Sequence, residues 1–411
     1  MAQLTRPDFE ALDKRDPLAD FRDKFVIPQD HIYLDGNSLG VLPRATPQKM
    51  REVVEQEWGQ GLTRSWNSCD WVNCQRRVGD KIAPIIGAAP SEVLVCDSTS
   101  VNLFKLAAAA LRLNPGRSKI VTEAGNFPTD LYVLEGLGAF CDAQISVDRV
   151  DRAHISQAID DNTAVLVLTH IHYKSGAMFD MAAITAQAKK KGALVLWDLS
   201  HSAGAVPVDL RAAGVDFAVG CGYKYLNGGP GAPAFLFVAE SHQADVRSPL
   251  SGWFAHARPF DFIDDFEPAA GIDRFQCGTP SVLGVAALEV GVELMAAADM
   301  GYIREKSTRL GDLFIQLLEQ HCPELTLVSP VDASKRGSHV SVAHPQGYAI
   351  MQALIQRRII GDFRAPDILR FGFTPLYVRY VDVWDCVIAL ADILQTQSWN
   401  CREFLQRAVV T

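Results

Sequence analysis

Short apolar runs alternate with amphipathic stretches between residues 91 and 240. Runs such as Ala164–Thr169 and Ala193–Trp197 are too short for buried helices and contain β-branched or aromatic residues, so we expect buried strands. The stretch Val101–Leu113 instead repeats its leucines and alanines at helical spacing, which predicts an amphipathic helix. Strands that alternate with helices are typical of an α/β fold built around a mostly parallel sheet.

The same pattern divides the whole chain. Helices and strands are mixed from Tyr302 onward, which indicates a second, smaller α+β domain. We therefore expect an N-terminal arm (1–50) that packs with the small domain, a large domain (51–300) and a small C-terminal domain (301–411). The expected strands lie at 32–34, 93–96, 120–121, 164–169, 193–197, 216–220, 234–238, 325–328, 339–342 and 368–373. The expected helices lie at 47–59, 101–113, 180–191, 282–298, 304–321 and 349–357, another helix follows Asp130 and ends at Gly138, and a polar loop is expected at 63–67.

Composition and charge narrow the class of protein. The chain has 411 residues, of which 48% are apolar and 21% charged, and its formal net charge is −9. An acidic balance argues against nucleic-acid binding as the main function. No apolar run approaches the length of a membrane span, so no membrane contact is expected. The polar stretch from Met1 to Asp20 has no apolar core of the kind that a secretory signal needs.

The cysteines and histidines of the sequence form no recognisable metal or redox site. Nine cysteines are scattered without a Cys-x-x-Cys pair, so we expect free thiols and a reducing cytoplasm. His170 and His172 alternate at the end of a predicted strand, but no third ligand follows at suggestive spacing, so we expect no metal. A Gly-x-Gly-x-x-Gly turn after a strand and a Walker A motif are both absent from the sequence, which leaves dinucleotide and nucleoside-triphosphate binding without support.

Candidate chemistry gathers at the ends of two consecutive predicted strands. The run that ends at Trp197 leads into Asp198 and His201, and the next run leads into Tyr223 and Lys224, followed by a glycine-rich bend. The carboxyl ends of parallel strands form the edge where open α/β folds bind ligands. An acid that faces a pyridine nitrogen and a lysine that forms a Schiff base are what a protein supplies to pyridoxal 5′-phosphate (PLP). Taken alone, Lys224 is also compatible with a solvated loop lysine, and Asp198 with a helix cap.

A second feature suits a phosphate group. The segment Asp97–Ser100 can cap the helix predicted from Val101, and hydroxyls with free amides at a helix N-terminus bind phosphate. Serine and threonine caps are common in all proteins, so this segment indicates a phosphate site only in combination with the other candidate residues.

These residues resemble the PLP enzymes of the aspartate-aminotransferase superfamily (fold type I), and within them the kynureninase family. The resemblance runs from Asp35-Gly36-Asn37-Ser38 to the string that begins at Arg370. Its most specific pieces are Phe127-Pro128-Thr129-Asp130, Asp198-Leu199-Ser200-His201, Tyr223-Lys224-Tyr225-Leu226-Asn227 and Gly252-Trp253-Phe254. It implies a large domain with a mostly parallel, mixed seven-stranded sheet, a smaller α+β domain, PLP as cofactor and a homodimer with shared active sites.

The resemblance also implies a role for each matching residue. Lys224 is the Schiff-base lysine, Asp198 pairs with the pyridinium nitrogen, and Tyr223 is a candidate proton donor. The remaining cofactor contacts implied are Thr99 and Ser100 at the phosphate, Phe127 stacked on the ring, Pro128, Thr129, Asp130, Thr169 and His201 in the same pocket, and Trp253 and Thr279 from the other subunit. Thr279 stands where some relatives have asparagine, so its hydrogen bond is the least secure of these.

The implied substrate contacts are Arg370 for the carboxylate, Ser38 nearby, and Trp66 and Phe254 around the aryl ring. Without the resemblance, Arg370 is equally compatible with a surface charge, and the aromatic residues with ordinary packing. The implied reaction is hydrolysis of L-kynurenine to anthranilate and L-alanine. Trp66, in place of a smaller polar residue, favours kynurenine over its 3-hydroxy form.

Three alternatives remain open at this level. Two are enzymes of the same fold, a cysteine desulfurase and a class-V aminotransferase. A desulfurase needs a mobile cysteine in the C-terminal part, whereas Cys322, Cys386 and Cys401 lie in or next to predicted helices. The third is a PLP-binding regulator, which normally carries a DNA-binding module that the short N-terminal arm does not provide.

Overall fold

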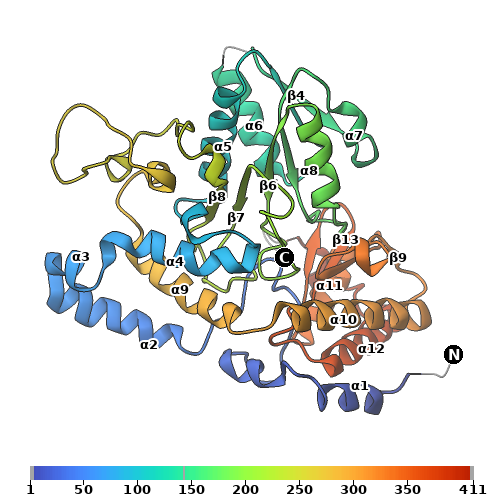
Figure 1. Cartoon of the computed structure of the whole chain (residues 1–411). Coiled ribbons are helices and arrows are strands. Elements are labelled where there is room, and N and C mark those ends of the chain that lie inside the picture. The colour runs from blue at the N-terminus through green and yellow to red at the C-terminus, as the bar shows by residue number, and fades with distance from the viewer. Residues whose placement is uncertain (1–3, 142–143, 408–411) are drawn as a thin grey trace. The chain divides into compact units, whose positions relative to one another are not determined.

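The computed structural model describes residues 4–141 and 144–407 and has an α/β fold (Figure 1). The chain forms two compact units. The first comprises Met1–Ala45, Ile171–Met178 and Ala297–Thr411, and the second comprises Thr46–His170 and Phe179–Ala296. Residues 1–3 of the predicted arm and 408–411 of the predicted small domain lie outside the described residues. The division into an arm (1–50), a large domain (51–300) and a small domain (301–411) stays a prediction.

A seven-stranded sheet forms the centre of the second unit. Its order is β2-β8-β7-β6-β5-β3-β4, with antiparallel pairing only where β8 meets β2 and β7. The mostly parallel, mixed seven-stranded sheet predicted from the sequence is therefore confirmed. The strands are β2 (Val93–Val95), β3 (Lys119–Glu123), β4 (Ser146–Val150), β5 (Thr163–Thr169), β6 (Leu194–Asp198), β7 (Phe217–Gly220) and β8 (Phe235–Val238).

Helices flank this sheet because both of its faces are apolar. Helix α5 (Thr99–Leu113) buries the predicted stripe of Leu103, Leu106 and Ala110 in the same core cluster as strand residues of β5 and β6. Trp197 of β6 is fully buried, and its Nε1 donates to Thr185 Oγ1 of α8 at 3.1 Å. The other helices of this unit are α2 (Thr46–Arg51), α3 (Ser65–Ser68), α4 (Cys74–Ile82), α6 (Pro128–Phe140), α7 (Ile155–Ala158), α8 (Met181–Lys190) and α9 (Val282–Ala296).

One local prediction for this unit was wrong, and one strand was missed. The expected loop at 63–67 is helical: a 3-10 turn, Leu62–Arg64, is followed by α3, and Ser65 Oγ donates to Glu57 O at 2.5 Å. Strand β4 was not expected from the sequence. It lies at the edge of the sheet and none of its residues is buried, so it lacks the apolar signal of the central strands.

The first unit has its own four-stranded antiparallel sheet, in the order β12-β13-β10-β9. Phe314 of α10 packs on Phe371 and Phe373, with ring centroids 4.9 and 5.3 Å apart. The strands are β9 (Thr326–Leu327), β10 (His339–Ala343), β12 (Asp362–Arg364) and β13 (Ile368–Gly372), and the helices are α1 (Arg6–Asp13), α10 (Met300–His321), α11 (Gly347–Gln356), α12 (Tyr380–Thr396) and α13 (Arg402–Leu405).

A parallel pair of short strands ties the N-terminal segment into this unit. β1 (Ile32–Tyr33) pairs with β11 (Ile359–Ile360), and Asp35 then forms an isolated bridge with Gly372. These pairings hold the turn that carries Ser38 beside β12 and β13. In the part of the chain that the structure describes, no helix is long and apolar enough to cross a membrane.

Candidate active site

Two strand ends in the second unit place polar groups at one edge of the sheet. Thr169 is the last residue of β5, Asp198 is the last residue of β6, and the two are partners in the parallel register. Lys224 follows β7, the next strand in the sheet. The predicted position of Asp198 at the carboxyl edge is confirmed, and this is the edge at which open α/β sheets bind ligands.

A buried pair of carboxyl groups lies at this edge. Asp198 is 4% exposed and Asp130 is 1% exposed, and the two carboxyl groups lie close enough for the charge of one to act on the other. Thr169 Oγ1 lies 3.0 Å from Asp130 Oδ2 and 2.7 Å from Asn126 Oδ1. Asn126 Nδ2 donates to Asp130 at 3.1 Å. The network therefore fixes the Asp130 carboxyl group with side chains from β5 and from the loop before α6.

The pair is electrostatically frustrated. Burial and the charge of Asp198 raise the pKa of Asp130 well above its ordinary value. Burial also raises the pKa of Asp198, although the Ser200 backbone N–H, which donates to its Oδ1 at 2.7 Å, opposes the shift. Lys224 lowers the pKa of both carboxyl groups through its positive charge. We infer that Asp130 holds a proton, which leaves Asp198 as the carboxylate available to a cationic partner.

Lys224 lies in the bend after β7. Its Nζ is 3.0 Å from His201 Nε2, 5.9 Å from the centroid of the Phe127 ring and 5.8 Å from that of Tyr223. The bend requires glycine at Gly222, because a Cβ there would lie 2.3 Å from the carbonyl oxygen of Pro233. The amine is thus held among a histidine and two aromatic rings.

The start of α5 provides hydroxyl groups. Ser98 is the N-cap and accepts a 3.4 Å hydrogen bond from Val101 N, while Thr99 and Ser100 lie half-buried in the first turn. Backbone N–H groups in the first turn of a helix have no partner within the helix and attract anions. The start of α6 has the same general form, with Pro128 at its first position, Thr129 next, and Phe127 40% exposed before it.

The aromatic residues predicted around the substrate ring contact one another. Trp66 lies 5.9 Å from Phe254 and 5.8 Å from Trp71 between ring centroids, and Trp253 lies 4.6 Å from Phe254. Phe254 is buried, whereas Trp253 is 39% exposed and Thr279 is also exposed. Because Trp253 and Thr279 are exposed, a partner molecule could contact both side chains.

Ser38 and Arg370 lie in the first unit and form part of a charged cluster there. Arg370 is 2% exposed, so the surface-charge alternative is wrong. Its Nε donates to Asp362 Oδ1 at 2.6 Å and its Nη1 to the Tyr173 carbonyl oxygen at 2.6 Å. Ser38 Oγ donates to Asp362 Oδ2 at 2.8 Å and accepts from Arg370 Nη2 at 3.0 Å. Arg364 completes the cluster with a 2.7 Å ion pair to Asp362.

Sequence reasoning missed several of these residues. Asn126 stood next to the singled-out Phe127 but was given no role, and Asp362 and Arg364 were not noticed. Asp362 and Arg370 are cross-strand partners on β12 and β13, a pairing that periodicity along the chain does not reveal. The only sequence signal for Asn126 was its position two residues before the helix that carries Asp130.

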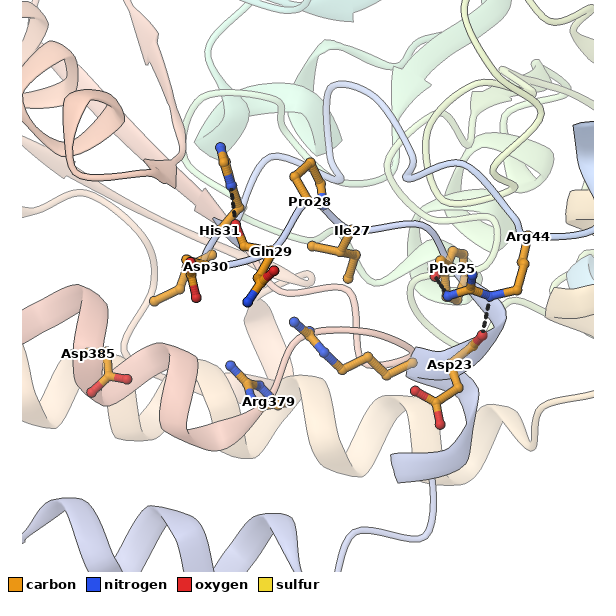
Figure 2. A pocket seen from close by; sticks show the side chains of 12 residues that line it. Asp23, Phe25, Ile27, Pro28, Gln29, Asp30, His31, Arg44, Arg379 and Asp385 are labelled. Atoms are coloured by element: carbon orange, nitrogen blue, oxygen red, sulfur yellow. Dashed lines mark hydrogen bonds between the residues drawn. The ribbon is translucent and has the colours of Figure 1, made fainter.

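A separate cavity of about 470 Å³ lies within the first unit (Figure 2). Arg44 and Arg379 line it together with Asp23 and Asp385. Protein groups already bind both guanidinium groups: Arg44 donates to the carbonyl oxygens of Asp23 and Phe25, and Arg379 donates to a carboxylate of its own helix. Neither Lys224 nor Asp198 lines this cavity. Within the described ranges 4–141 and 144–407, no group of three or more metal-ligating side chains occurs.

Comparison with known proteins identifies the family. The chain is 51% identical over 414 aligned residues to kynureninases of Burkholderia pseudomallei (strain K96243) and Pseudomonas fluorescens, and the alignment covers 99% of this chain and 100% of each relative. The chain belongs to the kynureninase family. The kynureninase C-terminal domain model matches residues 303–390, and the DegT/DnrJ/EryC1/StrS aminotransferase family model matches residues 76–217.

Solved structures with little sequence identity share the fold of this kynureninase family member. An apo cysteine desulfurase from Thermococcus onnurineus NA1 aligns with a TM-score of 0.78 at 18% identity, over 96% of this chain and 100% of that one. A cysteine desulfurase from Escherichia coli gives 0.76 at 19% identity, over 92% and 98%. A mutant of C-DES with glycine covalently linked to its PLP cofactor gives 0.74 at 16% identity, over 95% and 100%. The fold is thus fold type I.

Proposed function

We propose that this protein hydrolyses L-kynurenine to anthranilate and L-alanine with PLP as cofactor. The observation that carries the proposal is a lysine amine held next to a buried carboxyl pair, in a chain that belongs to the kynureninase family over its whole length. Fold alone does not define a reaction, since related folds perform many. The relationship at 51% identity supports this particular one.

The residues present fit PLP. Two carboxyl groups buried side by side, with Lys224 as the cation that acts on both, favour a cationic N–H donor such as a pyridinium at Asp198. Lys224 is the group that would bind the cofactor aldehyde, and the exposed ring of Phe127 offers a surface for the cofactor ring. Other groups proposed to hold it are Thr99, Ser100, Tyr223, Pro128, Thr129, Asp130, Thr169 and His201, with Trp253 and Thr279 reaching the cofactor of a second subunit.

When bound, PLP supplies an electron sink that stabilises negative charge formed on the amino-acid carbons. Lys224, once displaced by the substrate amine, is placed to take the proton from Cα, and His201 Nε2 at 3.0 Å orients its amine. Water adds to the γ-carbonyl of the substrate, and cleavage of the Cβ–Cγ bond releases anthranilate. Tyr223, next to Lys224 in the same bend, is the proposed donor of the proton that completes alanine.

Substrate binding is divided between aromatic and charged residues. In the second unit, we propose that Trp66 and Phe254, which contact each other, form two sides of the pocket for the aryl ring. We propose that they favour kynurenine over 3-hydroxykynurenine. In the first unit, we propose that Arg370 binds the α-carboxylate with Ser38 beside it, because a guanidinium suits a carboxylate geometrically. We propose that the reaction is a step of tryptophan degradation, including the branch that leads to NAD biosynthesis. We also propose that it takes place in the cytoplasm.

We further propose a homodimer with shared active sites. The loop between β8 and α9 (yellow in Figure 1) carries exposed aromatic residues that pack on each other: Trp253 is 39% exposed, Phe260 53% and Phe262 78%. Apolar groups gathered at one exposed place mark interaction sites. A second copy of the chain suits this loop, because the proposed contacts of Trp253 and Thr279 require a partner subunit.

Cysteine desulfuration is the nearest alternative activity. It needs an accessible, reactive thiol in the C-terminal part of the chain. Cys322 is 1% exposed and Cys386 is fully buried, and burial raises the pKa of Cys322 to about 12. Such thiols are inert. These two cysteines are therefore unsuited to desulfuration, whereas Cys401 is only partly buried.

The test is to incubate the PLP-loaded protein with L-kynurenine and, separately, with L-cysteine. We expect blue anthranilate fluorescence with kynurenine and no sulfide with cysteine. The Lys224→Ala variant should lose the cofactor absorbance band that depends on the lysine, and its turnover should fall by about 10³-fold. Lys190→Ala, an exposed lysine on α8, is the control and should behave as the wild type. Sulfide release without anthranilate, or near-normal turnover by Lys224→Ala, would refute the proposal.

A further inference from the structure

A charged cluster surrounds the proposed carboxylate-binding arginine, and it has more charged groups than binding a carboxylate requires. The cluster consists of Asp35, Ser38, Asp362, Arg364 and Arg370. Asp362 accepts a bidentate pair of hydrogen bonds from Arg370, one from Nε at 2.6 Å and a second, short one from Nη2. This is the geometry in which an arginine usually binds a carboxylate ligand. Ser38 and the Tyr173 carbonyl oxygen accept two more of its N–H groups. Most of the hydrogen-bonding capacity of Arg370 is thus used within the protein.

Arg364 is the less occupied of the two arginines. It pairs with Asp362 Oδ2 at 2.7 Å, and its side chain is 36% exposed. Its Nε is buried and has no hydrogen-bond partner among the described residues. Two guanidinium groups therefore share one carboxylate, which leaves the cluster with an unbalanced positive charge unless another acid ionises.

Asp35 is that other acid. It is half-buried, its Oδ1 is buried with no hydrogen-bond partner in the described part of the chain, and its bridge to Gly372 at the end of β13 holds it beside the cluster. Burial and the nearby charge of Asp362 raise the pKa of Asp35 to about 7, although Ser38 and the two arginines oppose the shift. Burial also disfavours the charged form of Asp362, but hydrogen bonds from Arg370 lower its pKa overall.

The two tyrosines that lie near Asp35 do not ionise near neutral pH. Burial raises the pKa of both Tyr33 and Tyr377, so both phenols stay neutral. Asp362 stays ionised, because the hydrogen bond and charge of Arg370 lower its pKa. Asp35 is therefore the group that switches the net charge of this cluster between positive and neutral.

We propose that Asp35 is a positioning residue whose neutral, protonated form leaves the cluster of Arg364, Arg370 and Asp362 with a net positive charge toward the α-carboxylate of the substrate. This proposal rests on the proposed function and adds Arg364 and Asp35 to its substrate-binding groups. When Asp35 is protonated, the cluster has a positive charge free for an anion. When it ionises as the pH rises, the added negative charge cancels that attraction, and carboxylate binding weakens.

The test compares two competitive inhibitors, 4-(2-aminophenyl)-4-oxobutanoate and its primary amide, which both lack the α-amine. Between pH 6 and pH 8.5 the inhibition constant of the carboxylate should rise several-fold, up to about tenfold for each unit by which the ligand shifts the pKa of Asp35. The amide should show no such rise. A carboxylate constant that does not change with pH, or an amide that follows the same profile, would overturn the proposal.

The Asp35→Asn variant adds a second measurement. Its KM for kynurenine should lack the alkaline rise seen in the wild type, while kcat changes little, because Asp35 acts on binding of the carboxylate alone. Asp161→Asn, 88% exposed and far along the chain in the second unit, should keep the wild-type profile. An unchanged profile in Asp35→Asn would also overturn the proposal. A wild-type protein that forms no anthranilate would instead refute the proposed function, and this inference with it.

Discussion

At the scale of single residues, the candidate active site is defined by an unfavourable arrangement that a ligand can relieve. Asp130 and Asp198 lie side by side at almost zero exposure, and neither has an arginine partner among its described contacts. Burying two ionised carboxylates together is costly, so one of them holds a proton. Perturbed acids of this kind gather at functional sites, which agrees with the proposed cofactor role.

This pair gives a pH-dependent prediction for the cofactor-free protein. The pKa of Asp130 is raised in the folded state, so the folded protein holds a proton that the unfolded chain releases above about pH 4. Stability should therefore fall as the pH rises from about 4 through the raised folded-state pKa, by about 1.4 kcal/mol for each unit of that shift. Asp130→Asn removes the charge but keeps an oxygen for Thr169.

The measurement is the melting temperature of both proteins, without PLP, at pH 5, 6.5 and 8. The wild type should lose stability relative to Asp130→Asn as the pH rises. The exposed variant Asp161→Asn should show a constant offset from the wild type. A constant offset for Asp130→Asn as well would mean that Asp130 is ionised in the folded protein.

At the scale of elements, the sheet that carries the site depends on close packing between a helix and a strand. Gly79 lies in the buried face of α4, and a Cβ there would lie 2.4 Å from the carbonyl oxygen of Val93 on β2. Gly136 lies in α6, where a Cβ would meet no atom within 4 Å. The two helical glycines thus have different reasons to be glycine, and only Gly79 is required by packing.

Substituting alanine should move the stability in opposite directions. Gly79→Ala should destabilise the protein by about 1–3 kcal/mol, because backbone atoms cannot yield as a flexible side chain can. Gly136→Ala should stabilise it by about 0.5–1 kcal/mol through the lower backbone entropy of the unfolded chain. Urea denaturation followed by circular dichroism checks both, with Gly136→Ala as the matched control. Equal effects for the two variants would contradict this account of α4 and β2.

At the scale of the whole molecule, the aromatic loop between β8 and α9 is the feature that a single chain does not explain. Phe262 is 78% exposed and has a φ of +49°, a backbone conformation that aspartate tolerates better than most residues. Phe140, at the end of α6, is exposed to the same extent. The two phenylalanines form a matched pair, one inside the proposed interface and one outside it.

Phe262→Asp should therefore shift the protein from dimer toward monomer, since a charge in an apolar interface is costly. Sedimentation velocity at micromolar concentration measures the change. Phe140→Asp should leave the distribution as in the wild type. If Phe262→Asp remains as dimeric as the control, the loop is not part of the subunit interface.

The amino-acid sequence by itself determined the α/β class, the strands of the central sheet other than β4, and the placement of Asp198 and Lys224 at its edge. The physical reason is that these features are local. Buried strands need apolar runs, and consecutive strands of a parallel sheet bring their carboxyl ends to the same side. Only the family resemblance, and not this pattern, gave the cofactor and the substrate.

The tertiary structure alone decided the strand order, the edge strand β4 and the charged cluster in the first unit. Ser38 and Arg370 are 332 positions apart in the chain, and Asp362 meets Arg370 only because β12 pairs with β13. Periodicity reports which face of an element is buried, but it carries no information on which element lies opposite. The charge state of Asp35 depends on just those neighbours, so no reading of the sequence alone could have assigned it.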